Sequence, residues 1–156
     1  MIKKVKNFFI KLVATFGGVG YFPFFPGTAG SFVALGLFYL IPEQSILLML
    51  AFLTSLFFVG VWSGGNVAKI LQKHDPSIVV IDEVLGMGIS LIAMPKIIWI
   101  YGLAFLIFRF FDISKIYPIN KMEKVSGGWG IMLDDLLAGF FTLFVVRLVM
   151  FLVIKS

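Results

Sequence analysis

Five of the eight acidic residues in this 156-residue chain occur in three groups, Asp82-Glu83, Asp112 and Asp134-Asp135. Each group lies at an end of an apolar segment, where a carboxylate is costly unless it is hydrated, paired or bound to a cation. Five charges brought together would repel one another, and a divalent cation removes that repulsion. An all-oxygen ligand set favours Mg²⁺, Mn²⁺ or Ca²⁺. Helix N-terminal dipoles or ion pairs with Lys and Arg are the alternative explanation for any one acid.

Two basic residues flank the middle acid, because Arg109 and Lys115 each lie three positions from Asp112. Cations next to a metal ion are the usual means of stabilising charge on a phosphoryl group. The alternative is that both residues anchor the chain at the cytoplasmic membrane surface.

A short polar stretch, Pro26-Gly27-Thr28-Ala29-Gly30-Ser31, precedes an apolar segment. Its glycine backbone and its hydroxyls could bind a phosphate at a helix N-terminus. We therefore expect Thr28, Gly30 and Ser31 to contact substrate. The alternative is a simple helix cap formed by Thr28 or Ser31.

The composition limits the possible chemistry and environment. The chain has no Cys and a single His, which excludes thiolate metal sites, Cys nucleophiles and His-rich metal cages. Hydrophobic residues make up 60% and charged residues 13%, which is unlike an ordinary soluble domain. The formal charge of +5 predicts contact with anionic lipid. No nucleic-acid partner is expected.

The elements that must position these residues are predicted to be helices of one membrane-embedded domain over residues 1–156. Residues 1–16 have the pattern of a basic amphipathic helix that lies in the membrane interface. Only the second and the last of the five apolar segments that follow are long enough to span a bilayer. The segments are Phe32–Ile41, Ser45–Trp62, Ile78–Met94, Ile97–Phe111 and Ile131–Ile154.

The predicted fold is therefore all-α, a polytopic membrane helical bundle. With the N-terminus inside, most Lys and Arg residues fall on the cytoplasmic side, as expected for membrane proteins. The three acidic groups then meet at that same face. Arg147 lies within the last apolar run and must either reach the interface or find a partner.

Two of the acidic segments have similar patterns, Ile81–Gly86 and Leu133–Gly139. Both read apolar, acid, acid, aliphatic, aliphatic, and then small residues. Small residues let helix backbones approach closely. The pattern predicts that the two segments form facing helices with their carboxylates side by side, although chance similarity between apolar helices would also explain it.

With these motifs in place, the sequence resembles the phosphatidylglycerophosphatase A family of bacterial membrane lipid phosphatases. The resemblance covers nearly the whole chain. It rests on Pro26–Ser31, His74-Asp75 with Ile81–Met87, Phe108–Ile113 with Lys115 and Pro118-Ile119, and Gly127–Gly139.

The resemblance implies Mg²⁺-dependent hydrolysis of phosphatidylglycerophosphate to phosphatidylglycerol and phosphate, at the cytoplasmic face of the bacterial inner membrane. We expect Asp82, Glu83, Asp134 and Asp135 to hold Mg²⁺, with Asp112 as a further ligand or as the base. A small ion or proton transporter that uses the buried carboxylates is the alternative function.

Overall fold

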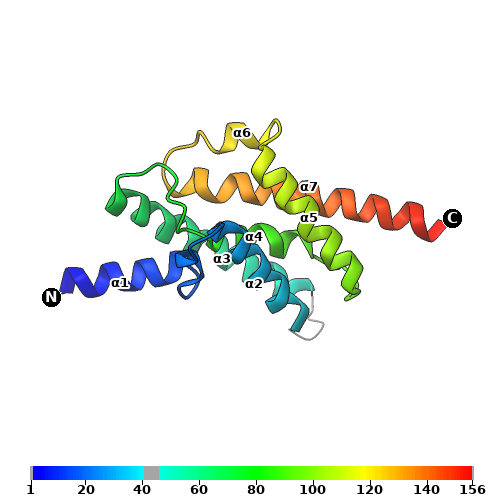
Figure 1. Cartoon of the computed structure of the whole chain (residues 1–156), viewed down its shortest axis with the longest axis horizontal. Coiled ribbons are helices and arrows are strands. Elements are labelled where there is room, and N and C mark those ends of the chain that lie inside the picture. Colours follow the sequence, from blue (N-terminus) through cyan, green and yellow to red (C-terminus); the bar gives the residue numbers. More distant parts are fainter. Residues whose placement is uncertain (1, 41–45, 156) are drawn as a thin grey trace.

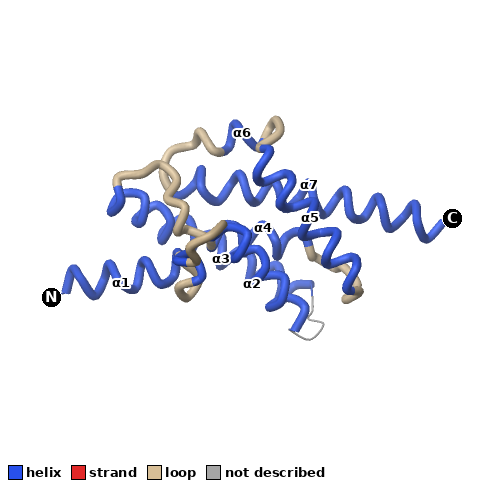
Figure 2. The backbone as a smooth tube through the Cα atoms, in the orientation of Figure 1, coloured by secondary structure: helices blue, strands red, loops and turns tan. Residues whose placement is uncertain are grey.

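The computed structural model describes residues 2–40 and 46–155, which form seven α-helices and one short 3₁₀ helix, η1 (Val19–Tyr21). All regular structure in these ranges is helical (Figures 1 and 2), which confirms the all-α prediction. The α-helices are α1 (Ile2–Ala14), α2 (Pro26–Leu40), α3 (Ile46–Leu71), α4 (Ile81–Ser90), α5 (Ile98–Ser114), α6 (Ile119–Met122) and α7 (Gly128–Lys155).

Helix α4 is the centre of the structure. It contacts α2, α3, α5 and α7, and every one of its residues except the half-buried Glu83 is buried. Its ten residues rise only about 15 Å, half of a hydrocarbon core. Helix α4 is therefore a packed core helix and not a membrane span.

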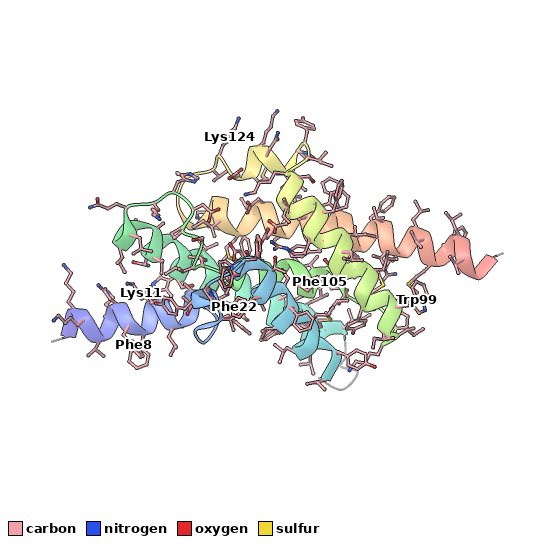
Figure 3. All side chains as sticks on the ribbon, in the orientation of Figure 1. Phe8, Lys11, Phe22, Trp99, Phe105 and Lys124 are labelled. Carbon is pink, nitrogen blue, oxygen red and sulfur yellow. The ribbon has the colours of Figure 1, made fainter. Side chains whose placement is uncertain are left out.

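Helices α3 and α7 are the two helices long and apolar enough to cross a membrane among the described residues. Most of their length is unburied, unlike the core helix of a soluble protein. Exposed apolar rings and aliphatic side chains cover much of the molecule (Figure 3), for example Phe8, Phe22 and Trp99. Apolar surface on this scale indicates contact with lipid, so the structure supports membrane association.

Helix α1 projects from one end of the molecule, and the end of α7 projects from the other (Figure 1). Ile10 and Ala14 of α1 are buried, and α1 packs on α3. Phe8 and Phe9 on α1 are exposed. This is the amphipathic helix predicted for residues 1–16, two residues shorter at its C-terminal end; its position in the membrane interface stays a prediction.

Several predicted boundaries were wrong, and packing explains most of the errors. The segment predicted to end at Trp62 continues to Leu71, through Gly64 and Gly65. A Cβ atom at Gly65 would lie 3.0 Å from the backbone nitrogen of Gly128, so glycine is required for close approach and does not break the helix. Tertiary packing here overrides local propensity.

The segment predicted over Ile78–Met94 is helical only from Ile81 to Ser90. A turn follows, with Ala93 at φ 51°, and then Pro95, which disfavours helical geometry in the residue before it. Ile41 and Ser45, where two other predicted segments end and begin, lie outside the described residues.

The two glycine-containing stretches Pro26–Ser31 and Ser126–Gly130 are mostly helical. Pro26 begins α2, as proline does at a first helical position, so neither Thr28 nor Ser31 caps that helix. Gly128 begins α7, where its backbone lies so close to the carbonyl of Val61 that a side chain would overlap it.

Candidate active site

The site is built where α4 crosses α7. A Cβ atom at Gly86 would lie 2.7 Å from the carbonyl oxygen of Asp135, and one at Gly139 would lie 2.5 Å from the carbonyl oxygen of Gly86. The backbones are therefore in direct contact, and the buried hydroxyl of Ser90 donates to the Gly86 carbonyl. The prediction of two facing helices with small residues after the acids is confirmed.

The crossing brings together carboxylates from both helices. Asp82, Glu83 and Asp135 offer oxygen atoms that all lie within 4.8 Å of one another. Asp82 and Asp135 are buried, and Glu83 is half-buried. Asp82 and Glu83 also share a side-chain hydrogen bond. These three residues, here called the acidic cluster, are a set that could hold a metal ion.

The acidic cluster lacks protein partners for part of its charge. Glu83 Oε2 is buried and has no hydrogen-bond partner within residues 2–40 and 46–155. Burial raises the pKa of Glu83 to about 7. Burial, and then the neighbouring Glu83 charge, raise the pKa of Asp82 well above its usual range. An unsatisfied oxygen among crowded oxygen donors fits a hard divalent cation.

Asp112 and Arg109, at the end of α5, form the next layer. Arg109 pairs with Asp112 across one turn, and its Nη1 donates to Ser31 Oγ at 3.3 Å. Asp112 also shares a side-chain hydrogen bond with Asp135. Arg109 Nε is buried, and none of the described residues accepts a hydrogen bond from it. The guanidinium is therefore held beside the acidic cluster with one donor unused.

Asp134 lies apart from the acidic cluster, although it is adjacent to Asp135 in sequence. Its Oδ2 accepts from Lys115 Nζ at 2.8 Å, and its Oδ1 accepts from the backbone N–H of Asp135. Lys115 also pairs with Glu123 at 3.1 Å. Sequence reasoning missed Glu123; the signal available was a lone acid between Lys121 and Lys124, close after Lys115.

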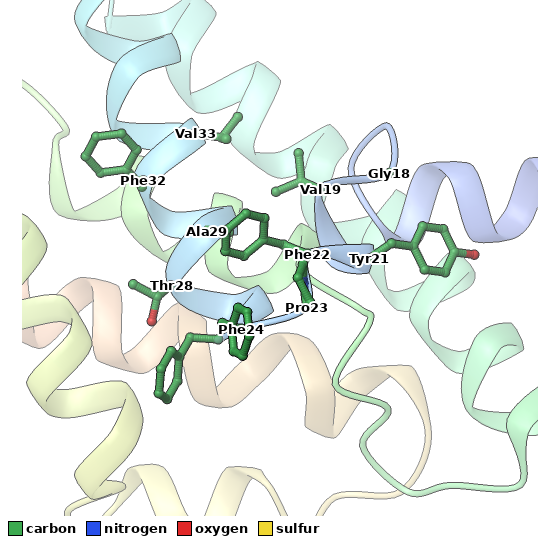
Figure 4. A pocket seen from close by; sticks show the side chains of 11 residues that line it. Gly18, Val19, Tyr21, Phe22, Pro23, Phe24, Thr28, Ala29, Phe32 and Val33 are labelled. Carbon is green, nitrogen blue, oxygen red and sulfur yellow. The ribbon is translucent and has the colours of Figure 1, made fainter.

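Helix α2 presents its first turns to the site. Gly27 packs so closely on Glu83 that a side chain there would overlap Oε1. Ser31 is buried beside Arg109, and its hydroxyl donates to the carbonyl of Gly27. Gly30 packs on Val80, where an added Cβ would lie 2.8 Å from Val80 Cβ. Thr28 lines an apolar pocket instead (Figure 4).

The fold and the site together define an all-helical, membrane-associated protein with buried carboxylates beside a guanidinium. A model of the Phosphatidylglycerophosphatase A family matches residues 12–150. The chain belongs to this family, and is therefore a lipid phosphatase that acts on phosphomonoesters. Family membership favours phosphatase chemistry over the ion-pathway alternative.

Curated relatives agree on the family but differ in name. A Bacteroides thetaiotaomicron protein that carries the provisional name phosphatidylinositol-3-phosphatase is 39% identical over 151 residues, 92% of this chain and 94% of that protein. Phosphatidylglycerophosphatase A of Escherichia coli is 39% identical over 135 residues (82% and 76%). Phosphatidylglycerophosphatase A of Haemophilus influenzae is 37% identical over 141 residues (88% and 86%). No solved structure matches the chain.

Proposed function

We propose that this protein hydrolyses the phosphomonoester of phosphatidylglycerophosphate, in a reaction that requires Mg²⁺, and leaves phosphatidylglycerol in the membrane. The observation that carries the proposal is the acidic cluster, with its unpartnered Glu83 oxygen, next to the unused Nε donor of Arg109. Negative oxygen ligands and a cationic donor side by side suit a phosphate group bound through a divalent cation.

Asp82, Glu83 and Asp135 would hold the cation. When bound, Mg²⁺ would supply positive charge that stabilises the phosphoryl oxygens. Both oxygens of Asp134 are already engaged by Lys115 and by backbone, so we assign Asp134 the role of positioning Lys115. This assignment narrows the ligand set expected from the sequence from four residues to three.

Arg109 and Lys115 would bind the phosphate oxygens, and Ser31 would orient Arg109 through its hydrogen bond. Asp112 would accept the proton of the attacking water as the water oxygen bonds to phosphorus. The bond from phosphorus to the glycerol oxygen breaks, and the departing alkoxide would take the proton held by Asp112, which gives the free hydroxyl and restores the carboxylate. Inorganic phosphate is the other product.

The acidic cluster is proposed to face the cytoplasm in the bacterial inner membrane. Lys115 contacts Asp134, the residue next to Asp135 of the cluster, and Lys121 and Lys124 follow Lys115 in the sequence. Basic residues concentrate on the cytoplasmic side of membrane proteins.

The test is phosphate release by the purified full chain in detergent micelles, with MgCl₂ or with EDTA. The substrates are phosphatidylglycerophosphate, phosphatidylinositol 3-phosphate, phosphatidic acid and glycerol 3-phosphate. Mg²⁺-dependent release that is fastest from phosphatidylglycerophosphate is expected. Faster release from phosphatidylinositol 3-phosphate would instead assign the activity named for the Bacteroides relative.

A further inference from the structure

A large apolar pocket lies between η1, the loop after it and the outer face of α2 (Figure 4). Its volume is about 800 Å³, within the range of roughly 300–1,000 Å³ seen for small-molecule sites. Its walls include Phe22, Phe24, Phe25, Thr28, Phe32 and Val33. None of the described residues that line it is charged.

The pocket is open, and its walls are unusually exposed. The exposed fractions are 71% for Phe24, 79% for Phe25 and 64% for Phe32. Phe25 also has φ 53°, a strained backbone for a bulky residue. Rings held outward at this cost need apolar material against them, and a membrane protein has that material in lipid chains.

The pocket and the acidic cluster lie on opposite faces of the same turns of α2. At 100° per residue, Gly27 and Ser31 share one face, and Thr28, Ala29 and Phe32 lie on the other. The first face contacts Glu83 and Arg109, whereas the second lines the pocket. The Cα cylinder of a helix is only about 5 Å across.

We propose that this pocket binds an acyl chain of the lipid phosphate whose phosphate lies in the acidic cluster, so that the lipid passes over the N-terminus of α2. The inference rests on the proposed function and adds to it the residues that recognise the hydrophobic part of the substrate. A lipid phosphate is anionic at one end and apolar at the other. The face of α2 that contacts Glu83 and Arg109 suits the anionic end, and the face that lines the pocket suits the apolar end. Thr28, at the edge of the pocket, is placed to contact the ester region.

The first experiment fills or empties the pocket in the full chain. Ala29→Phe adds a ring within it, and Phe22→Ala removes an exposed ring from its wall. We expect each to lower kcat/KM for a phosphatidylglycerophosphate with 16-carbon chains about tenfold, because several buried CH₂ groups lose their contacts. The loss for the same headgroup on four-carbon chains is expected to be at least fivefold smaller.

Matched controls lie outside the pocket. Gly102→Phe adds a ring on α5 where an added Cβ meets open space, and Phe144→Ala removes a ring of α7 that is 68% exposed. Both are expected to keep wild-type ratios between the two chain lengths. Equal losses on both chain lengths in the pocket variants, or no loss in either variant, would overturn the proposal. So would a change in oligomeric mass without a change in chain-length preference, since a second copy would then be the occupant.

A second experiment needs no turnover. A diacyl lipid phosphate with a photoactivatable group on its chain is cross-linked to the full chain in micelles, and the labelled residues are mapped by mass spectrometry. Labelling concentrated in residues 21–33 is expected, and labelling spread over α3 and α7 without residues 21–33 would refute the pocket. If the lipid labelled the pocket of a wild-type protein that hydrolyses none of the lipid phosphates, the proposed function would be wrong and the proposed pocket would stand.

Discussion

Both halves of α7 are predominantly apolar, but their surroundings differ. In the first half, Asp134, Asp135, Ala138 and Thr142 are buried. Contacts with α3 at Gly65, with α4 at Gly86 and with α5 at Phe111 are made in this half. After Thr142, Val146 is the only buried residue among those whose side chains are described. The first half thus forms the site, and the second half is mostly free to contact lipid.

The comparison shows that packing against other helices, and not composition, provides partners for the carboxylates of α7. A carboxylate in the second half would face hydrocarbon without partners, which is costly. In the first half, Asp135 has Asp82, Glu83 and Asp112 around it, and Asp134 has Lys115. The short helix α4 makes this possible, because its glycine at position 86 lets it approach the α7 backbone.

The largest expected effect comes from removing charge in the packed half. Asp135→Asn and Asp82→Asn keep side-chain size but each remove one anionic ligand from the acidic cluster. We expect phosphate release to fall by about a thousandfold or more, since charge stabilisation is the main catalytic contribution at such sites. Phosphate release in micelles at saturating Mg²⁺ is the measurement.

The matched control is Glu123→Gln, which removes a carboxylate that pairs with Lys115 outside the acidic cluster. It should cost less than tenfold. If Asp135→Asn were no more damaging than this control, the assignment of the acidic cluster would be wrong. Size-exclusion profiles and thermal unfolding in detergent establish that each variant is folded.

The next largest effect concerns the crossing itself. Gly139→Val would force its side chain against the Gly86 carbonyl, only 2.5 Å from the Cβ position, and separate the helices. Overpacking of this kind costs about 1–3 kcal/mol, and we expect activity to fall about a hundredfold. Gly102→Val, where an added Cβ on α5 meets open space, is the control and should retain most activity. Equal activity of the two variants would show that the close approach is not needed.

The sequence predicted the site better than it predicted the helix ends. Charged residues in an apolar chain have few acceptable environments. The free-energy cost of a carboxylate in hydrocarbon was therefore enough to predict that Asp82-Glu83, Asp112 and Asp134-Asp135 lie on one side of the molecule. The pattern also predicted the pairing of the α4 and α7 segments, through the small residues after the acids.

What the sequence did not predict depends on contacts between distant segments. Asp134 is held away from the acidic cluster by its ion pair with Lys115, which lies just after the end of α5. Thr28 and Ser31 fall on different faces because α2 begins at Pro26, earlier than predicted. Glycines at 64, 65 and 128 look like breakers locally, yet they are the points where α3 and α7 touch.

The pH dependence sharpens the assignment of the acidic cluster. Burial raises the pKa of Glu83 to about 7, so in the absence of a cation this carboxyl holds a proton below that pH. A metal ligand must lose its proton to bind, so the apparent Mg²⁺ affinity should weaken about tenfold per pH unit below pH 7 and level off above pH 8. The measurement is Mg²⁺ activation of phosphate release from pH 5.5 to 8.5. Glu83→Gln should weaken this dependence along with most activity and leave the part due to Asp82, whose pKa burial also raises. An unchanged slope would show that Glu83 is not the group that titrates.

The smallest effect is expected in the exposed half of α7, at Arg147. Its Nη2 donates to the carbonyl oxygen of Ile92 at 3.1 Å, just past the end of α4. This contact ties the outer half of α7 to the short helix that carries Asp82 and Glu83, and it gives the arginine of the last apolar run a partner.

Arg147→Gln should lower the free energy of unfolding by about 1 kcal/mol, because a charged hydrogen bond to a helix end is lost. Activity should stay within about threefold of wild type, since Arg147 lies about 18 Å along α7 from Asp135 of the acidic cluster, at 1.5 Å per residue. Thermal unfolding in detergent measures the first quantity, with Leu148→Gln as a control that alters the same exposed region without touching α4. If Arg147→Gln abolished activity while leaving stability unchanged, the division of α7 into a site half and a lipid-facing half would fail.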